Sequence, residues 1–225
     1  MKRQLLLTAD GSHTILVPDI NVTYHSIHGA VQESQHIYIN AGIKPLLDKY
    51  QPLKILEVGF GTGLNALLAL KEALQNNQHI EYAAIELFPL EEKEYTVLNY
   101  CELLQADNLK DYFLAMHTAA WDKPLNIHPL FSLHKIHTSL LEASFTKTFH
   151  CIFFDAFAPN DQPGLWTKEI FEKMFAVLEN RGILVTYCCK GSVRRALLAA
   201  GFAVEKLAGP PGKKEIIRAT KKLID

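Results

Sequence analysis

Three glycines spaced two residues apart form the first candidate site. They lie in Glu57-Val-Gly59-Phe-Gly61-Thr-Gly63, where an apolar run gives way to a helical pattern. Glycine allows positive φ and close approach of a ligand to the backbone, and a helix start offers free N–H groups. A dinucleotide fingerprint needs GxGxxG, but Leu64 replaces its third glycine. The spacing and the leading Glu57 favour S-adenosylmethionine, and a tight connection without a ligand is the alternative.

Glu86 is the second candidate, because it closes the next predicted strand, residues 81–86. A carboxylate at such a strand end can accept hydrogen bonds from both hydroxyls of a ribose. Nicotinamide enzymes use the same device, so this residue alone does not distinguish the two cofactors. A solvated strand end is the plainer interpretation.

Asp155 is the third candidate, within the apolar segment His-Cys-Ile-Phe-Phe-Asp-Ala-Phe at 150–157. A carboxylate at the end of a buried parallel strand projects into the crevice where doubly wound sheets bind ligands. An alkylamine with a pKa of about 10 must lose a proton before it attacks a methyl group. A carboxylate can orient that nitrogen and stabilise its developing positive charge. The layout Asp-Ala-Phe-Ala-Pro is similar to the Asp-Pro-Pro-Tyr motif of amino methyltransferases, and a loop-capping aspartate is the alternative.

The remaining candidates carry weaker signals. Trp166 could stack on a base or plug the start of a helix. His134 and His137 would lie on opposite faces of a strand, and His25 and His28 are expected at the surface, so we predict no metal site. The four cysteines contain no CxxC pair, which fits reduced thiols.

The elements that must position these residues alternate between strand and helix. We predict an N-terminal β-hairpin at 5–20, a loop leading into a helix, and a final antiparallel hairpin with a Pro/Gly turn. Strands are expected at 54–58, 81–86, 131–137, 150–155 and 183–189, and helices at 64–74, 90–104, 168–179 and 193–200. The third of these helices should end at Asn180-Arg181-Gly182, with the glycine as left-handed cap. This is the doubly wound α/β pattern.

Length and composition limit the organisation of the chain. With 225 residues, 48% of them apolar, we expect one domain, 1–225, with a hairpin and active-site cover at 1–45 and a core at 46–225. The N-terminus has neither a signal-peptide pattern nor a membrane span, so we expect a cytoplasmic protein without membrane contact. The net charge is −1, yet residues 181–225 hold ten Lys/Arg against three acids. Such a basic end fits phosphate binding, and a solvated helix face with a charged tail is the alternative.

Six segments together resemble the methyltransferase domain of the MnmC family of tRNA-modifying proteins, from about Thr23 to Thr220. They are YHSIHGAVQESQHIYI, LEVGFGTGLN, IELFPL, FFDAFAPNDQPGLWT, GSVRRALLAAGF and GPPGKKEIIRAT. The resemblance implies a class I methyltransferase fold. It also implies methylation of the 5-aminomethyl group on (2-thio)uridine 34, the wobble base in the tRNA anticodon loop, with S-adenosylmethionine as donor.

The resemblance also implies roles for particular residues. Asp155 matches the catalytic carboxylate, and Tyr24, Ser26, Glu33 and Ser34 fall in the segment that covers cofactor and amine. Cofactor contacts are expected at Ser26, Glu33, Glu57, Gly59, Phe60, Gly61, Gly63, Asn65, Glu86 and Asp155. Substrate contacts are expected at Tyr24, Phe157, Pro159, Trp166, Lys190, Arg194, Arg195, Lys213 and Lys214.

Two departures from the family pattern stand out. No second glycine fingerprint for an FAD-dependent oxidase precedes Asp225, so we expect an aminomethyl substrate supplied by separate FAD-dependent or MnmE/MnmG-type enzymes. No acid for adenine occurs at His137-Thr138-Ser139. Three other interpretations stay open: a small-molecule amine transferase related to polyamine synthases, a catalytically silent tRNA-binding module, and a nicotinamide oxidoreductase.

Overall fold

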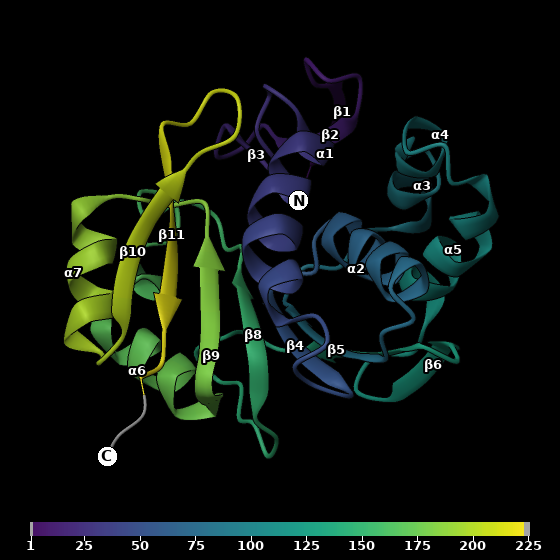
Figure 1. Ribbon diagram of the computed structural model, residues 1–225. Helices are drawn as coiled ribbons and strands as arrows, with labels where there is room; N and C mark the ends of the chain where they lie inside the picture. Colours follow the sequence, from purple (N-terminus) through teal and green to yellow (C-terminus); the bar gives the residue numbers. More distant parts are fainter. Residues whose placement is uncertain (1, 223–225) are drawn as a thin grey trace.

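One eight-stranded sheet organises the computed structural model, which describes residues 2–222 (Figure 1). Residues 1 and 223–225, the ends of the predicted 1–225 domain and including Asp225 of the basic end, lie outside the described residues. Across the sheet the strands are β10 (Ala203–Ala208), β11 (Glu215–Thr220), β9 (Leu178–Thr186), β8 (Phe149–Phe154), β4 (Leu53–Val58), β5 (Ile80–Glu86), β7 (Phe131–His137) and β6 (Pro124–His128).

The five central strands are parallel, and both edges of the sheet are antiparallel. Strands β9, β8, β4, β5 and β7 pair in parallel, whereas β6 pairs antiparallel with β7. At the other edge β11 runs antiparallel to both β9 and β10. This confirms the predicted α/β sheet with a closing antiparallel hairpin.

The N-terminal hairpin is also confirmed, with one strand more than predicted. Strands β1 (Gln4–Leu7), β2 (His13–Val17) and β3 (Val22–Thr23) form a separate antiparallel sheet. A loop then leads into the predicted helix, which comprises α1 (Ala30–Ser34), the π-helix η1 (Gln35–Ile43) and the 3-10 turn η2 (Lys44–Leu46). Gly42 lets this helix lie close to the sheet, since a Cβ there would be 2.9 Å from the Phe153 ring.

Helices cover both faces of the sheet (Figure 1). On one face η1, α2 (Leu64–Gln75) and α5 (Lys110–Thr118) pack with buried residues that include Ile55 and Phe153. On the other face α6 (Lys168–Val177) and α7 (Gly191–Ala199) pack with Leu56, Ile152 and Phe154. The period of two along β8 follows from the alternating direction of strand side chains. Both faces are therefore apolar, as the continuous run at 150–154 predicts.

Two predicted helices differ in the structure. The predicted helix 90–104 is split into α3 (Glu92–Tyr95) and α4 (Tyr100–Leu103), because Asn99 between them holds the N-terminal hairpin. Its side chain accepts from the His13 N–H at 2.9 Å and donates to the Gly11 carbonyl at 2.8 Å. The chain continues through η3 (Asp107–Leu109) into α5, and neither α5 nor β6 was predicted.

The end of α6 also corrects a prediction. The helix ends at Val177, and the chain enters β9 at once. Arg181, with φ 64°, takes the left-handed conformation that we predicted for Gly182. Gly182 is required for space, since a Cβ there would lie 2.7 Å from the Leu178 side chain.

Candidate active site

Three neighbouring strand ends bring the predicted glycine turn and both acids together. Strand β4 lies between β5 and β8, with Val58 beside Ile85 on one side and Phe154 on the other. The Gly59 N–H donates to the Ile85 carbonyl at 3.0 Å, and the Asp155 N–H donates to the Val58 carbonyl at 3.1 Å. Carboxyl ends of parallel strands are where doubly wound sheets bind ligands.

A cavity of about 340 Å³ opens at these strand ends. Pockets for small molecules and cofactors begin at roughly this size. Its lining includes eight of the predicted site residues. They are Tyr24, Gly59, Phe60, Gly61, Asn65, Glu86, Asp155 and Phe157.

The glycine turn needs glycine for two reasons. Gly59 and Gly61 have φ values of 94° and 51°, which side chains rarely adopt. A Cβ at Gly59 would lie 3.0 Å from the Asp155 carbonyl oxygen, and one at Gly61 would lie 3.0 Å from the Tyr24 ring. Larger residues would therefore push the turn into the cavity. Gly63 precedes α2 and faces His117 instead of the cavity.

Glu86 is held in place by backbone N–H groups. One carboxylate oxygen accepts from the Gly61 N–H at 2.9 Å, and the other accepts from the Phe88 N–H at 2.7 Å. Each oxygen keeps a lone pair for a further donor. The carboxylate can therefore accept two hydroxyl groups from a ligand in the cavity.

Asp155 accepts one hydrogen bond on each carboxylate oxygen. The Tyr38 hydroxyl donates to Oδ1 at 2.6 Å, and Asn65 Nδ2 donates to Oδ2 at 2.9 Å. Burial raises the pKa of Asp155 to about 7, although both hydrogen bonds lower it. A carboxylate with a pKa near neutrality is suited to accept a proton at physiological pH.

Glu57 lies behind the cavity and does not line it, so its contact with the cofactor stays a prediction. It is 1% exposed, and its Oε1 accepts from Asn65 Nδ2 at 2.8 Å. Burial raises its pKa well above the usual range. Asn65 thus uses both amide hydrogens to join Glu57 to Asp155, which fixes the orientation of the second carboxylate.

Sequence reasoning missed two residues of this site. Tyr38 is 1% exposed, and no local pattern connects it with Asp155. His25, expected at the surface, is 8% exposed, lines the cavity and lies 2.7 Å from the Thr62 hydroxyl. Burial lowers the pKa of His25 to about 4, so its ring is neutral at pH 7. Tyr38 lies in a π-helix, a feature frequent at functional sites, but this feature became visible only in the structure.

Hydroxyl and apolar groups form the far end of the cavity. This end contains Thr138, Ser139, Leu140 and Leu141, which follow β7, together with Leu87 and Phe88. The segment 137–139 contains no acid, and the cavity wall at this position is mostly apolar. Such a wall is suited to pack against the faces of a flat ring.

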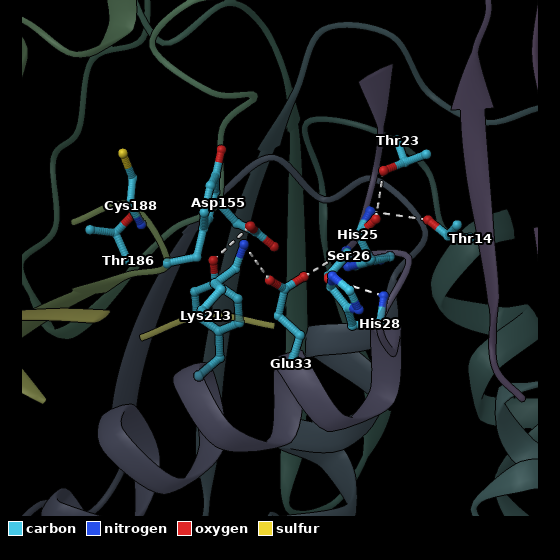
Figure 2. A network of polar contacts seen from close by, with 12 residues as sticks. Thr14, Thr23, His25, Ser26, His28, Glu33, Asp155, Thr186, Cys188 and Lys213 are labelled. Atoms are coloured by element: carbon cyan, nitrogen blue, oxygen red, sulfur yellow. Dashed lines mark hydrogen bonds and ion pairs between the residues drawn. The ribbon is translucent and has the colours of Figure 1, made fainter. Parts of the chain in front are cut away.

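In the predicted cover segment, Glu33 lies beside Asp155 and contacts other protein groups (Figure 2). Glu33 accepts from the Ser26 N–H at 2.8 Å and lies 3.1 Å from Lys213 Nζ. Neither Ser26, Glu33, Ser34 nor Lys213 lines the cavity. This geometry therefore gives no support to direct cofactor contacts by Ser26 and Glu33.

Several predicted substrate contacts lie outside the cavity. Trp166 is 6% exposed, packs edge-on against Phe154 and donates from Nε1 to the Phe157 carbonyl at 2.8 Å. These contacts favour the packing interpretation of Trp166, and its stacking on a base stays a prediction. Pro159 is half-buried on that rim. Four basic residues are exposed away from the cavity: Lys190, which contacts Asn160, and Arg194, Arg195 and Lys214.

Within residues 2–222, no group of three or more His, Cys, Asp or Glu side chains is arranged to bind a metal ion. No helix in the same range has both the length and the apolar character needed to cross a membrane.

Comparisons with known proteins agree with this geometry. Residues 117–222 match a family model described as S-adenosyl-L-methionine-dependent methyltransferase. The crystal structure of MNMC2 from Aquifex aeolicus superposes with a TM-score of 0.79 at 24% identity, over 98% of this chain and 70% of that chain. Together with the sheet topology, these findings define the class by its fold: the chain has the class I S-adenosylmethionine-dependent methyltransferase fold.

Within that class, the chain resembles the MnmC proteins over most of its length. It is 29% identical over 86% of its length to the tRNA 5-methylaminomethyl-2-thiouridine biosynthesis bifunctional protein MnmC of Leptospira borgpetersenii. It is 26% identical over 95% of its length to the protein of the same name from Burkholderia mallei. The chain spans about a third of the length of these curated relatives, 31% and 34% respectively.

Proposed function

We propose that this chain transfers a methyl group from S-adenosylmethionine to a primary amine, the 5-aminomethyl group on the wobble uridine of tRNA. The observation that carries the proposal is the carboxylate of Asp155, held by Tyr38 and Asn65 at the edge of the cofactor cavity. An amine nitrogen gains positive charge as it attacks the methyl group, and a carboxylate beside it can compensate that charge.

The cofactor supplies a methyl group on a positively charged sulfur. The protein therefore has to bind the cofactor, orient the substrate amine and remove a proton from it. Glu86 would accept the ribose hydroxyls, and the backbone of Gly59 and Gly61 would border the cofactor closely. The wall at 138–141 would enclose the adenine ring. Asp155 would accept an N–H of the amine and align its lone pair with the methyl group, which is a positioning effect. Tyr24 and Phe157, whose rings meet edge-on at 5.3 Å, would close the cavity on the substrate side.

The tRNA substrate is supported by the names of the relatives and by the exposed basic residues Lys190, Arg194, Arg195 and Lys214. A recessed methyl group requires the base to leave its stack, as enzymes that modify bases generally do. We propose that residues 1–225 form a single methyltransferase domain, in which residues 1–45 are the hairpin and active-site cover and residues 46–225 are the core. We also propose a cytoplasmic location and separate upstream enzymes that supply the aminomethyl group.

The decisive assay combines purified protein and labelled S-adenosylmethionine with bulk tRNA from cells that lack the wobble methyl group. We expect label in tRNA, at the aminomethyl nitrogen after nucleoside digestion. Label in small polyamines without any gain from tRNA would instead identify a small-molecule amine transferase. Binding of tRNA without turnover would identify a silent binding module.

A further inference from the structure

An ion pair between the two ends of the chain lies beside Asp155. Glu33 belongs to α1, and Lys213 belongs to the turn between β10 and β11. Lys213 Nζ is 3.1 Å from Glu33 Oε1, and the two side chains are 27% and 9% exposed. Figure 2 shows them pointing toward each other next to Asp155. The side chains of the Lys93–Glu91 pair are 77% and 65% exposed, and those of the Lys168–Glu172 pair are 51% and 49% exposed. The Glu33–Lys213 pair is therefore less screened by solvent than these two.

Further contacts hold both partners in place. The Lys213 ammonium lies 5.0 Å from the ring centroid of Tyr187, whose hydroxyl donates to the Ala156 carbonyl at 2.9 Å. Glu33 is fixed by the Ser26 N–H. Because Ala156 follows Asp155, these contacts connect the ion pair to the loop that carries the candidate catalytic carboxylate.

The titratable groups around Asp155 and the ion pair come from six elements or loops. The titratable groups that influence it or border the pair are Glu33, Tyr38, Glu57, Tyr187, Cys188 and Lys213, with His25 near Glu33. Lys213 is the cation in this set. Glu33 raises the pKa of Asp155, and Lys213 lowers it. Without Lys213, the uncompensated charge of Glu33 would lie beside Asp155, and the combined negative charge would favour the protonated form of a nearby amine.

We propose that Lys213 is a positioning residue for methyl transfer: it neutralises Glu33, so that the substrate amine meets the single negative charge of Asp155. The inference deepens the proposed function and rests on it. In the transfer, the nitrogen lone pair forms the new N–C bond, and the C–S bond breaks with its electron pair going to sulfur. The surplus proton on nitrogen passes to Asp155 or to water. A protonated amine has no lone pair, so a second free carboxylate would slow this step at neutral pH.

The test is a double-mutant cycle that removes each charge of the pair, followed across pH. The variants are Lys213→Gln, Glu33→Gln, the double variant and Lys213→Arg, assayed by kcat/KM for tRNA between pH 6 and 9. In the plot of kcat/KM against pH, activity rises along an acidic limb. We expect Lys213→Gln to move this limb to higher pH by about one unit, so that kcat/KM falls roughly tenfold at pH values well below the limb. The double variant should return the limb close to its wild-type position, and Lys213→Arg should keep it there. Lys168→Gln is the matched control, because its exposed pair with Glu172 also measures 3.1 Å.

A different pattern is expected if the Glu33–Lys213 pair only holds the two segments together and has no electrostatic effect on the reaction. In that case the single variants and the double variant all lose activity at every pH with an unmoved acidic limb, which overturns the proposal. If Lys213→Gln does not fold, the double variant still decides between a wild-type limb and a general loss.

A second measurement needs no turnover. Carbon NMR of labelled aspartate carboxyl groups, with Asp155→Asn to identify the resonance, follows the pKa of Asp155 directly. A rise in Lys213→Gln that is reversed in the double variant supports the ion pair's role, even if wild-type protein fails to methylate tRNA and the proposed function falls. An unchanged pKa in both variants overturns the inference while leaving methylation itself intact.

Discussion

The hydroxyl of Tyr38 donates a 2.6 Å hydrogen bond to Oδ1 of Asp155, across 117 positions of sequence. Tyr38 lies in the π-helix η1, and Asp155 follows the central strand β8. The bond orients the carboxylate and favours its charged form, which opposes the effect of burial. The strength of Asp155 as a base therefore depends on the helix that the N-terminal segment places over the sheet.

Removing the Tyr38 hydroxyl should shift the pH dependence of the reaction. In Tyr38→Phe the charged form of Asp155 loses a donor, so the pKa of Asp155 rises above its value of about 7. Less carboxylate is present at pH 7, and the rate falls there but recovers as pH increases. The measurement is kcat/KM against pH, with Tyr112→Phe, which lies on α5, as the control. A uniform loss at all pH values would mean that the ring position, and not the hydrogen bond, is what matters.

Replacing Asp155 itself should separate binding from chemistry. Asp155→Asn keeps the size of the side chain but cannot compensate the positive charge on the amine. We expect cofactor affinity, measured by calorimetry, to change little and the methylation rate to fall about 10²- to 10⁴-fold. The exposed Asp161→Asn serves as control. A wild-type rate in Asp155→Asn would remove this residue from its role.

Glu86 should control affinity for the cofactor. In Glu86→Gln one end of the side chain becomes an NH₂ group, which cannot accept from the Gly61 or Phe88 N–H. Hydrogen bonds to charged groups contribute about 1.5–3 kcal/mol. We therefore expect S-adenosylmethionine to bind roughly 10- to 100-fold more weakly by calorimetry. Glu81→Gln, on the same strand, should bind as the wild type does, and equal binding in both variants would contradict a ribose contact.

The exposed arginines of α7 should contribute to tRNA binding through phosphates. Arg194→Ala and Arg195→Ala are each expected to weaken binding and to reduce the slope of log K against log salt by about 0.7–0.9 per lost phosphate contact. Filter binding or fluorescence anisotropy at several salt concentrations provides the slope. Lys168→Ala, on α6, is the control. A slope that stays unchanged in both arginine variants would give these side chains no contact with the nucleic acid.

In the basic C-terminal region, the number of Lys and Arg residues in the sequence differs from the number of positive charges available at the surface. Ten Lys and Arg residues occur after residue 180. In the structure Lys206 and Arg218 pair with Glu215 and Glu205, and Lys221 donates to carbonyl groups within the protein. Fewer of these charges are therefore available to phosphates than the sequence count indicates.

The sequence by itself determined the order of strands and helices except for α5, β6 and the split helix at 90–104, and it also determined the glycine turn and the acids at strand ends. These follow from local patterns: apolar periodicity, glycines where φ is positive, and carboxylates at the last position of a buried strand. Glu86 and Asp155 could be placed in one crevice because parallel strands end at the same edge of a sheet.

Only the tertiary structure decided which other side chains reach Asp155. Tyr38 and Lys213 approach it from opposite ends of the chain, and Trp166, which looked like a ligand contact, is buried in packing. Such contacts depend on how η1 docks on β8 and the β10–β11 hairpin docks on β9, two strands that lie between them in the sequence. No periodicity encodes that docking, because it is selected by the packing of many side chains at once.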